Sequence, residues 1–239
     1  NRGSWLDFEY DVKDFLYFKI DRKKKIFASS LLLALGYTKS DIANEFYDSE
    51  KYFFDSTSQK WKTKFNPENY KAKNFSEEII DASNGKVIIK LGDKINYLTA
   101  KKLFNDGLKN ILVSKESLYG KFLHTDVKIN NEEGEILKIG TELNETIIQQ
   151  ILDSNINTLE ISITNSINKG GYLLTTIFND KNNTKDEAIT EIYKMLRPGE
   201  PPTIEIATQI FNNLFFSSDR YDLSDVGRVK MNSRLSLEC

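Results

Sequence analysis

The sequence predicts an α+β protein, in which a mixed helix/strand lobe is interrupted by a smaller β-rich inserted domain with an internal strand-helix-strand repeat. Three observations support this fold class. Alternating apolar residues begin the chain, a repeat of fixed spacing occupies its middle, and capped amphipathic helices follow the repeat. We therefore expect a discontinuous lobe formed by residues 1–46 plus 169–239, with the inserted domain at residues 47–168.

The first segment predicts a β-hairpin. Leu6, Phe8 and Tyr10 alternate with acidic residues, which is typical of a half-buried strand, and residues 15–21 form a second apolar run after a polar turn. Residues 22–25 are the densest positive run of the chain. Such a run is either a solvated turn or a contact for phosphate.

Two short helices are expected next. Residues 26–35 predict a buried helix ended by Gly36, and Thr38 is a suitable N-cap for a second helix that runs through Phe46. A DNA-reading helix-turn-helix is an alternative interpretation of this pair. The second helix disfavours it, because its Asp41 and Glu45 would face phosphate groups.

The middle of the chain contains an internal repeat. Two segments, which begin near residues 86 and 134, each predict a strand, a turn, a short helix and a second strand. We expect the two copies to pack into a small pseudo-symmetric β-barrel or sandwich. The second copy is acidic, which indicates either a solvated face or a surface for a basic partner. The matched pairs lie 48 positions apart: Gly92/Gly140, Ile95/Leu143, Leu103/Ile151, Leu108/Ile156 and Ile111/Leu159.

The last third of the chain predicts a strand at residues 172–178 and then two helices. Thr184 and Glu187 have the spacing of a capping box and open a helix that ends at Arg197. Thr203 starts the next helix, whose apolar stripe includes Ile206, Ala207, Ile210, Phe211, Leu214 and Phe215. Three of the four prolines lie between these helices, at 198, 201 and 202, and predict a rigid elbow.

Composition excludes most catalytic chemistry. The chain has one histidine, His124, and one cysteine, Cys239, so multi-histidine metal sites and internal disulfides are not available, and the single cysteine is consistent with a reducing cytoplasm. No phosphate-binding loop, nucleophile elbow or carboxylate triad is present. No apolar run approaches the ~20 residues of a membrane span. Because the first residue is asparagine, we interpret the chain as a piece of a longer protein.

The arginines lie only near the two ends of the chain. None occurs between Arg22 and Arg197, and lysine provides the positive charge of the middle. Arginine binds phosphate and carboxylate with a planar fork that lysine lacks. This distribution predicts that the two ends form one unit with a looser segment inserted between them. The net charge of −2 requires a local patch for any contact with nucleic acid.

Several motifs at both ends resemble the β subunit of bacterial DNA-dependent RNA polymerase. They lie in residues 2–9, 20–22, 197–203, 213–216, 219–223 and 226–228, and match the β lobe, or domain 2, of that family. The segment around residues 47–168 resembles, in position and length, the lineage-specific insertion of proteobacterial β subunits. The resemblance implies a lobe that lines the downstream DNA cleft and contacts the single-stranded edge of the transcription bubble during DNA-templated RNA synthesis.

The resemblance also implies roles for particular residues. The residue matching Trp5 stacks on an unpaired base, and those matching Asp21, Arg22, Arg197 and Arg220 line or support the same face. From the residues alone, the pattern favours a core tryptophan of the hairpin at Trp5. The two C-terminal arginines have alternative partners in nearby carboxylates, namely Glu200, Asp219 and Asp222.

The resemblance further implies that the chain takes part in a nucleotidyltransferase without supplying catalytic residues, because the catalytic Mg²⁺ is bound by another subunit. It implies ribonucleoside binding by the assembled enzyme, and no cofactor in this fragment. The implied partners are the α, β′ and ω subunits, a σ factor, downstream and single-stranded promoter DNA, and transcription factors on the insert. The implied location is the bacterial cytoplasm, at the nucleoid, and no membrane. A stand-alone protein–protein adaptor without a nucleic-acid role is the alternative.

Overall fold

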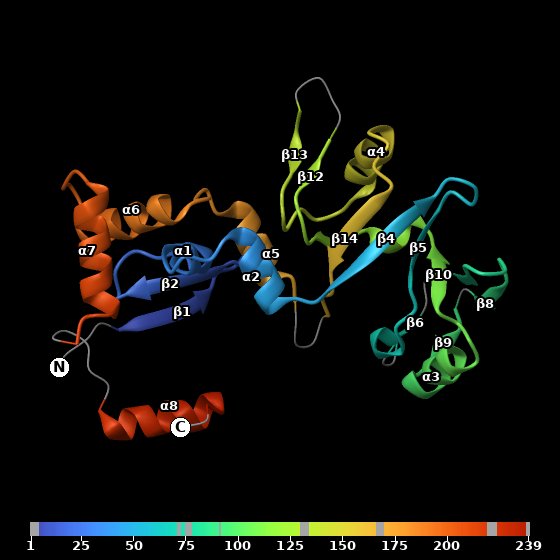
Figure 1. Ribbon diagram of the computed structural model, residues 1–239, viewed down its shortest axis with the longest axis horizontal. Coiled ribbons are helices and arrows are strands. Elements are labelled where there is room, and N and C mark those ends of the chain that lie inside the picture. Colours follow the sequence, from blue (N-terminus) through green and yellow to red (C-terminus); the bar gives the residue numbers. More distant parts are fainter. Residues whose placement is uncertain are drawn as a thin grey trace. The chain divides into compact units, whose positions relative to one another are not determined.

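The computed structural model describes residues 5–70, 73–74, 78–90, 92–129, 134–165, 170–218 and 224–237 (Figure 1). The chain forms two compact units. Unit 1 comprises Asn1–Thr38 with Asp180–Cys239, and unit 2 comprises Lys39–Asn179. Helices and antiparallel strands occur in both units, which confirms the α+β class. That residues 47–168 are an insertion within a lobe stays a prediction.

Unit 1 begins with a three-stranded antiparallel sheet of order β1-β2-β3. The predicted hairpin is confirmed, with Leu6 opposite Ile20 and Tyr10 opposite Leu16. The helix predicted at residues 26–35 begins later, because its first two residues pair with β2 as a short strand. The elements are β1 (Leu6–Tyr10), β2 (Leu16–Ile20), β3 (Ile26–Phe27) and α1 (Ala28–Ala34).

The core of unit 1 lies where α1 packs on β2 and on α6 (Lys185–Leu196). The predicted capping box is confirmed: the Thr184 hydroxyl accepts from the Glu187 N–H, and the Glu187 carboxylate accepts from the Thr184 N–H. Asp180 is buried and its Oδ2 accepts from the hydroxyls of Ser29, at 2.5 Å, and Ser30, at 2.8 Å. This carboxylate therefore connects α1 to the segment that leads into α6.

The two last helices are less buried than their sequence predicts. In α7 (Ile204–Phe215) Thr203 is the N-cap as expected, but of the predicted stripe only Ala207 and Phe211 are buried. Ile206 remains 46% exposed, because α7 packs on α6 along a narrow face. In α8 (Asp225–Leu235) no side chain is buried. The described part of unit 1 thus has apolar helix surface that it does not cover itself.

Unit 2 is built on a seven-stranded sheet of order β11-β14-β4-β5-β10-β7-β8, in which all neighbours are antiparallel (Figure 1). Two further strand pairs, β12–β13 and β6–β9, lie outside it. The strands are β4 (Ser49–Asp55), β5 (Lys60–Lys64), β6 (Lys73–Asn74), β7 (Ile79–Asp81), β8 (Val87–Ile89), β9 (Lys94–Ile95), β10 (Asn110–Val113), β11 (Phe122–Leu123), β12 (Val127–Lys128), β13 (Ile136–Leu137) and β14 (Thr158–Ser162).

The predicted repeat is confirmed in the helices and their ends. Asn96 and Asn144 cap α3 and α4 through their side-chain oxygens, and Gly107 and Asn155, with positive φ, follow the two helices at equivalent positions. The final strands of the copies, β10 and β14, flank the β4–β5 hairpin on opposite sides. The copies therefore share one open sheet and do not form the expected barrel or sandwich. The helical elements are α3 (Tyr97–Asn105), α4 (Glu145–Asp153), η1 (Pro67–Tyr70) and η2 (Lys115–Leu118).

The strand predicted at residues 172–178 is wrong, because this segment is the helix α5 (Tyr172–Asn179). Short apolar runs are compatible with either structure, and here the buried residues Leu173, Leu174 and Ile177 follow helical spacing. The Thr176 hydroxyl donates to the carbonyl of Tyr172 one turn earlier, as threonine does in helices.

The histidine is buried in unit 2, beside α2 (Lys39–Phe46). His124 Nδ1 lies 2.9 Å from the Ser162 hydroxyl, and Nε2 lies 2.9 Å from Asn44 Oδ1. Burial lowers the pKa of His124, and the charge of Glu160 opposes this shift. The side chain therefore connects α2 to the end of β14 as a neutral hydrogen-bonding group.

Candidate nucleic-acid interface

The indole of Trp5 lies at the surface and not in the core of the hairpin. Trp5 is 76% exposed, while its backbone N–H and carbonyl are both hydrogen-bonded to Asp21. The Trp5 N–H donates to Asp21 Oδ1 at 2.8 Å, and the Asp21 N–H donates to the Trp5 carbonyl at 2.9 Å. The ring is thus presented to solvent on a fixed stretch of backbone. Asp21 acts here through its hydrogen bond to Trp5.

The turn after β2 has an unusual backbone. Asp21 and Arg22 both have positive φ, at 49° and 58°, and the Lys23 N–H donates to the Ile20 carbonyl, which is the pattern of a type I′ turn. Aspartate tolerates this region better than most residues, whereas arginine does so at a cost. The turn places the exposed Arg22 directly beside the residue that holds Trp5.

A lysine of this turn connects it to the proline elbow. Lys23 Nζ donates to the Leu196 carbonyl at 2.8 Å, at the C-terminal end of α6. A cation is favourable there, because the last carbonyls of a helix carry partial negative charge. The structure thus brings together the beginning of the chain and the elbow at residues 197–203, as the distribution of arginines predicts. The bond joins residues 173 positions apart.

Arg197 forms an ion pair on this surface. Its Nη1 lies 3.2 Å from Glu200 Oε2, which also accepts from the Tyr193 hydroxyl at 3.0 Å. These hydrogen bonds, with that from Arg197 the larger contribution, hold the pKa of Glu200 below its usual value. Burial and the bond to Glu200 raise the pKa of Tyr193. The Arg197 side chain is still 52% exposed, so the pair leaves much of the guanidinium accessible.

Beside Trp5, strand β1 presents apolar side chains to solvent. Leu6, Phe8 and Tyr10 are 38%, 55% and 58% exposed, although their partners on β2 include the fully buried Phe18. The strand is therefore more exposed than the half-buried strand that its pattern predicts, because β1 is an edge strand. Because Leu6, Phe8 and Tyr10 alternate with Asp7 and Glu9, these apolar side chains share one face of the hairpin.

Of the five predicted site residues, the structure joins Trp5 to Asp21 and places Arg22 next to them. Arg197 belongs to the same unit, next to the residue bound by Lys23, whereas Arg220 lies outside the described residues. Sequence reasoning missed the contact made by Lys23 and the role of Asp21 as a backbone partner. The high density of positive charge at residues 22–25 was the signal that could have suggested the former.

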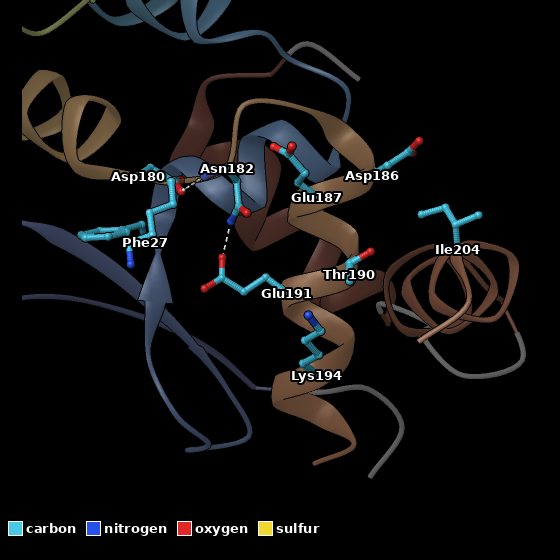
Figure 2. Close-up of a pocket in the computed structure, with 10 residues that line it drawn as sticks. Phe27, Asp180, Asn182, Asp186, Glu187, Thr190, Glu191, Lys194 and Ile204 are labelled. Carbon is cyan, nitrogen blue, oxygen red and sulfur yellow. Dashed lines mark hydrogen bonds between the residues drawn. The ribbon is translucent and has the colours of Figure 1, made fainter. Parts of the chain in front are cut away.

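An open pocket of about 710 Å³ lies on the other side of α6 from its buried face. Figure 2 shows Glu187, Thr190, Glu191 and Lys194 projecting along it from α6, with Asn182 opposite. Asn182 Nδ2 donates to Ser30 Oγ at 3.0 Å and to the Glu191 carboxylate. These bonds tie the segment before α6 to the helix, which accounts for the polar lining.

The described residues contain no group of three His, Cys, Asp or Glu side chains that could hold a metal ion. Across the same residues, no helix is long and apolar enough to cross a membrane.

The C-terminal part of the chain matches a known family. Residues 170–239 match the family described as RNA polymerase Rpb2, domain 2.

Nearly the whole chain is also similar to curated proteins that bear one name. It is 43% identical over 236 residues to the DNA-directed RNA polymerase subunit beta of Rickettsia prowazekii. It is 42% identical over 236 residues to the proteins of the same name from Rickettsia felis and Rickettsia rickettsii. Each alignment covers 99% of this chain and 17% of the relative, so the chain spans about a sixth of the length of these proteins. The chain is thus a segment that belongs to the β-subunit family of DNA-directed RNA polymerase.

Proposed function

We propose that this chain forms a non-catalytic lobe of the polymerase β subunit, which lines the downstream DNA cleft and contacts the single-stranded edge of the transcription bubble. The observation that carries the proposal is the exposed Trp5, which is held by Asp21 beside a cationic turn. A rigidly presented aromatic ring stacks on any unpaired base, and nearby cations attract the phosphates. Arg22, Arg197 and Arg220 are the arginines assigned to that surface.

The proposal includes the assembly around the lobe. The partners are the α, β′ and ω subunits, a σ factor and promoter DNA, in the cytoplasm at the nucleoid. Nucleotide transfer belongs to the assembled enzyme, whose Mg²⁺ and catalytic residues lie in another subunit. The resemblance of the chain to polymerase β subunits over 99% of its length supports this assignment.

We also propose that residues 47–168 are an inserted domain that docks transcription factors. The family match begins at residue 170, just after the expected end of the insert. The Tyr47 hydroxyl donates to the Gly170 carbonyl at 2.9 Å and accepts from the Leu173 N–H, so the two ends of the segment are close together. Deletion of residues 47–168 from reconstituted polymerase should therefore spare basal transcription and alter the response to factors. Loss of basal activity in a well-folded deletion would contradict a peripheral insert.

The role of Trp5 is tested in reconstituted polymerase by Trp5→Ala. Because Trp5 binds Asp21 through backbone groups only, the substitution leaves those bonds in place. Loss of one stacked base costs about 1–3 kcal/mol, so open-complex lifetime should fall roughly 5- to 150-fold. With Trp5→Phe, which keeps an aromatic ring, the open-complex lifetime should fall less. Val12 is fully exposed in the same unit, so Val12→Ala should leave the lifetime unchanged. An unchanged lifetime with Trp5→Ala would refute the stacking role.

A further inference from the structure

The two faces of the seven-stranded sheet in unit 2 differ in what they contact. Tyr52, Trp61 and Ile111 lie on one face and belong to the hydrophobic core. Successive residues of a strand point to opposite faces, so the residues between them face away from that core. We call this second face the open face; it consists of the strand residues that alternate with the core residues.

One row of the open face crosses six strands and is mostly apolar. Phe53 and Val87 are 48% and 38% exposed, Ile80 is half-buried, and Leu112, between Lys62 and Ile80, is buried at 9% exposure. Because paired residues lie on the same face, these side chains lie in one row, in which Lys62 separates Phe53 from the other three. The row, in order of Cα partners, is Thr158, Phe53, Lys62, Leu112, Ile80 and Val87.

Lysines give the open face a positive charge that contrasts with the net charge of the chain. Lys62 lies in the row, and Lys51 and Lys64 lie two residues along their strands on the same face; all three are exposed. Among the ion pairs found in the described part of the chain, none involves these three lysines.

Two carboxylates share the face, and both have local hydrogen bonds. Glu160, the Cα partner of Lys51, accepts from the Ser49 hydroxyl at 2.5 Å. Asp55 accepts from Thr57 and Ser58 within the hairpin turn, and these bonds hold its pKa below the usual value. The lysines are therefore the groups of the face that are left to attract an oppositely charged partner.

We propose that the open face binds an acidic amphipathic helix of a protein partner. Apolar side chains of the helix cover the row, and its carboxylates pair with Lys51, Lys62 and Lys64. Six strands about 4.8 Å apart span roughly 24 Å, which equals about 16 residues of helix at 1.5 Å per residue. A helix on an apolar sheet face is the common way to cover such a surface.

The composition of the row favours protein over single-stranded nucleic acid. Surfaces that bind single strands stack successive bases on several aromatic rings. Here Phe53 is the one aromatic residue of the row, and Leu112, Ile80 and Val87 are aliphatic. The inference rests on the proposed docking of transcription factors by this segment, and it assigns the surface and the partner chemistry.

The test measures binding of a labelled synthetic peptide of about 16 residues to the 239-residue chain by fluorescence anisotropy. The peptide has leucines at helical spacing on one face and glutamates beside them. We expect binding that weakens as salt is raised. Combined Lys51→Glu, Lys62→Glu and Lys64→Glu should weaken it at least tenfold, and Phe53→Ala should weaken it severalfold. The matched control reverses three exposed lysines elsewhere in unit 2, Lys101, Lys128 and Lys138, and should retain the affinity.

The proposal is overturned if the peptide does not bind, if the control triple variant weakens it equally, or if a peptide with lysines in place of the glutamates binds as well. Binding of a single-stranded oligothymidine of the same span, lost in Lys51→Glu/Lys62→Glu/Lys64→Glu while the peptide fails to bind, would replace the protein partner with nucleic acid. The readout does not require transcription. If the peptide fails but deletion of residues 47–168 still alters factor response, factor docking stands and the assigned surface is wrong.

Discussion

The single histidine predicts that unit 2 loses stability in mild acid. His124 is 2% exposed and its two ring nitrogens are hydrogen-bonded to Ser162 and Asn44. Burial lowers its pKa below the usual 6.5, more than the carboxylate of Glu160 raises it. The unfolded chain therefore binds a proton at a higher pH than the folded chain does. Stability is fully present above about pH 6.5 and falls as the pH drops from there toward the folded pKa of His124.

The size of the effect is limited by the one proton involved. The free energy of unfolding should fall by at most about 1.4 kcal/mol per pH unit in this window. In His124→Gln the slope between about pH 6.5 and 5.5 should vanish, because no group there titrates at this pH. The variant should also be less stable at pH 7.5, by about 1–3 kcal/mol, since a buried hydrogen bond is lost or distorted.

The assay is urea unfolding followed by the fluorescence of Trp61, which is fully buried in unit 2. A Trp5→Phe background removes the other tryptophan, so that the signal reports unit 2 alone. An NMR titration of the imidazole, which needs no assignment because the chain has one histidine, gives the folded pKa directly. A folded pKa at or above 6.5, or the same slope in His124→Gln, would refute the reasoning.

Three further predictions concern stability. Gly140→Ala should destabilise unit 2 by several kcal/mol more than Gly92→Ala in urea unfolding. Both glycines have positive φ, so both substitutions strain the backbone. A Cβ at position 140 would also clash with the Leu174 carbonyl oxygen, whereas a Cβ at position 92 would have nothing within 4 Å. Equal costs would contradict this account. Asn96→Ala and Asn144→Ala should each cost about 0.5–2 kcal/mol, whereas Asn→Ser should cost little at either cap; no loss would exclude a capping role. Asp180→Ala should cost about 2–5 kcal/mol in thermal or urea unfolding, because it leaves the buried Ser29 and Ser30 hydroxyls without their acceptor. Asp180→Ala should cost less in the Ser29→Ala/Ser30→Ala variant, where only the bond from the Asn182 N–H to Asp180 Oδ1 remains to be lost, and additive losses would contradict the coupling.

The features that could be predicted from the sequence are those with local causes. The capping box of Thr184 and Glu187 and the caps at Asn96 and Asn144 depend on neighbours three residues away, so pattern alone locates them. The fixed spacing between Gly92 and Gly140 identified the repeat in the same way.

Features that depend on distant residues could not be predicted. The run at residues 172–178 is apolar enough for either a strand or a helix, and its buried side chains decide for a helix. The two repeats share one sheet because β4 and β5, which belong to neither copy, lie between their final strands. At the candidate interface, the bond from Lys23 to the Leu196 carbonyl joins segments far apart in sequence, and the positive run at residues 22–25 does not identify the partner.

The discontinuity of unit 1 has a consequence for how the protein is made. The ribosome releases β1, β2 and α1 first, but α6, against which α1 packs, follows only after the whole of Lys39–Asn179 has been synthesised. At roughly 5–20 residues per second, this interval is on the order of ten seconds. The apolar side of α1 is without its cover during that time, whereas unit 2 is complete and contiguous. Vectorial synthesis therefore favours an order in which the interrupting unit folds before the unit that it interrupts.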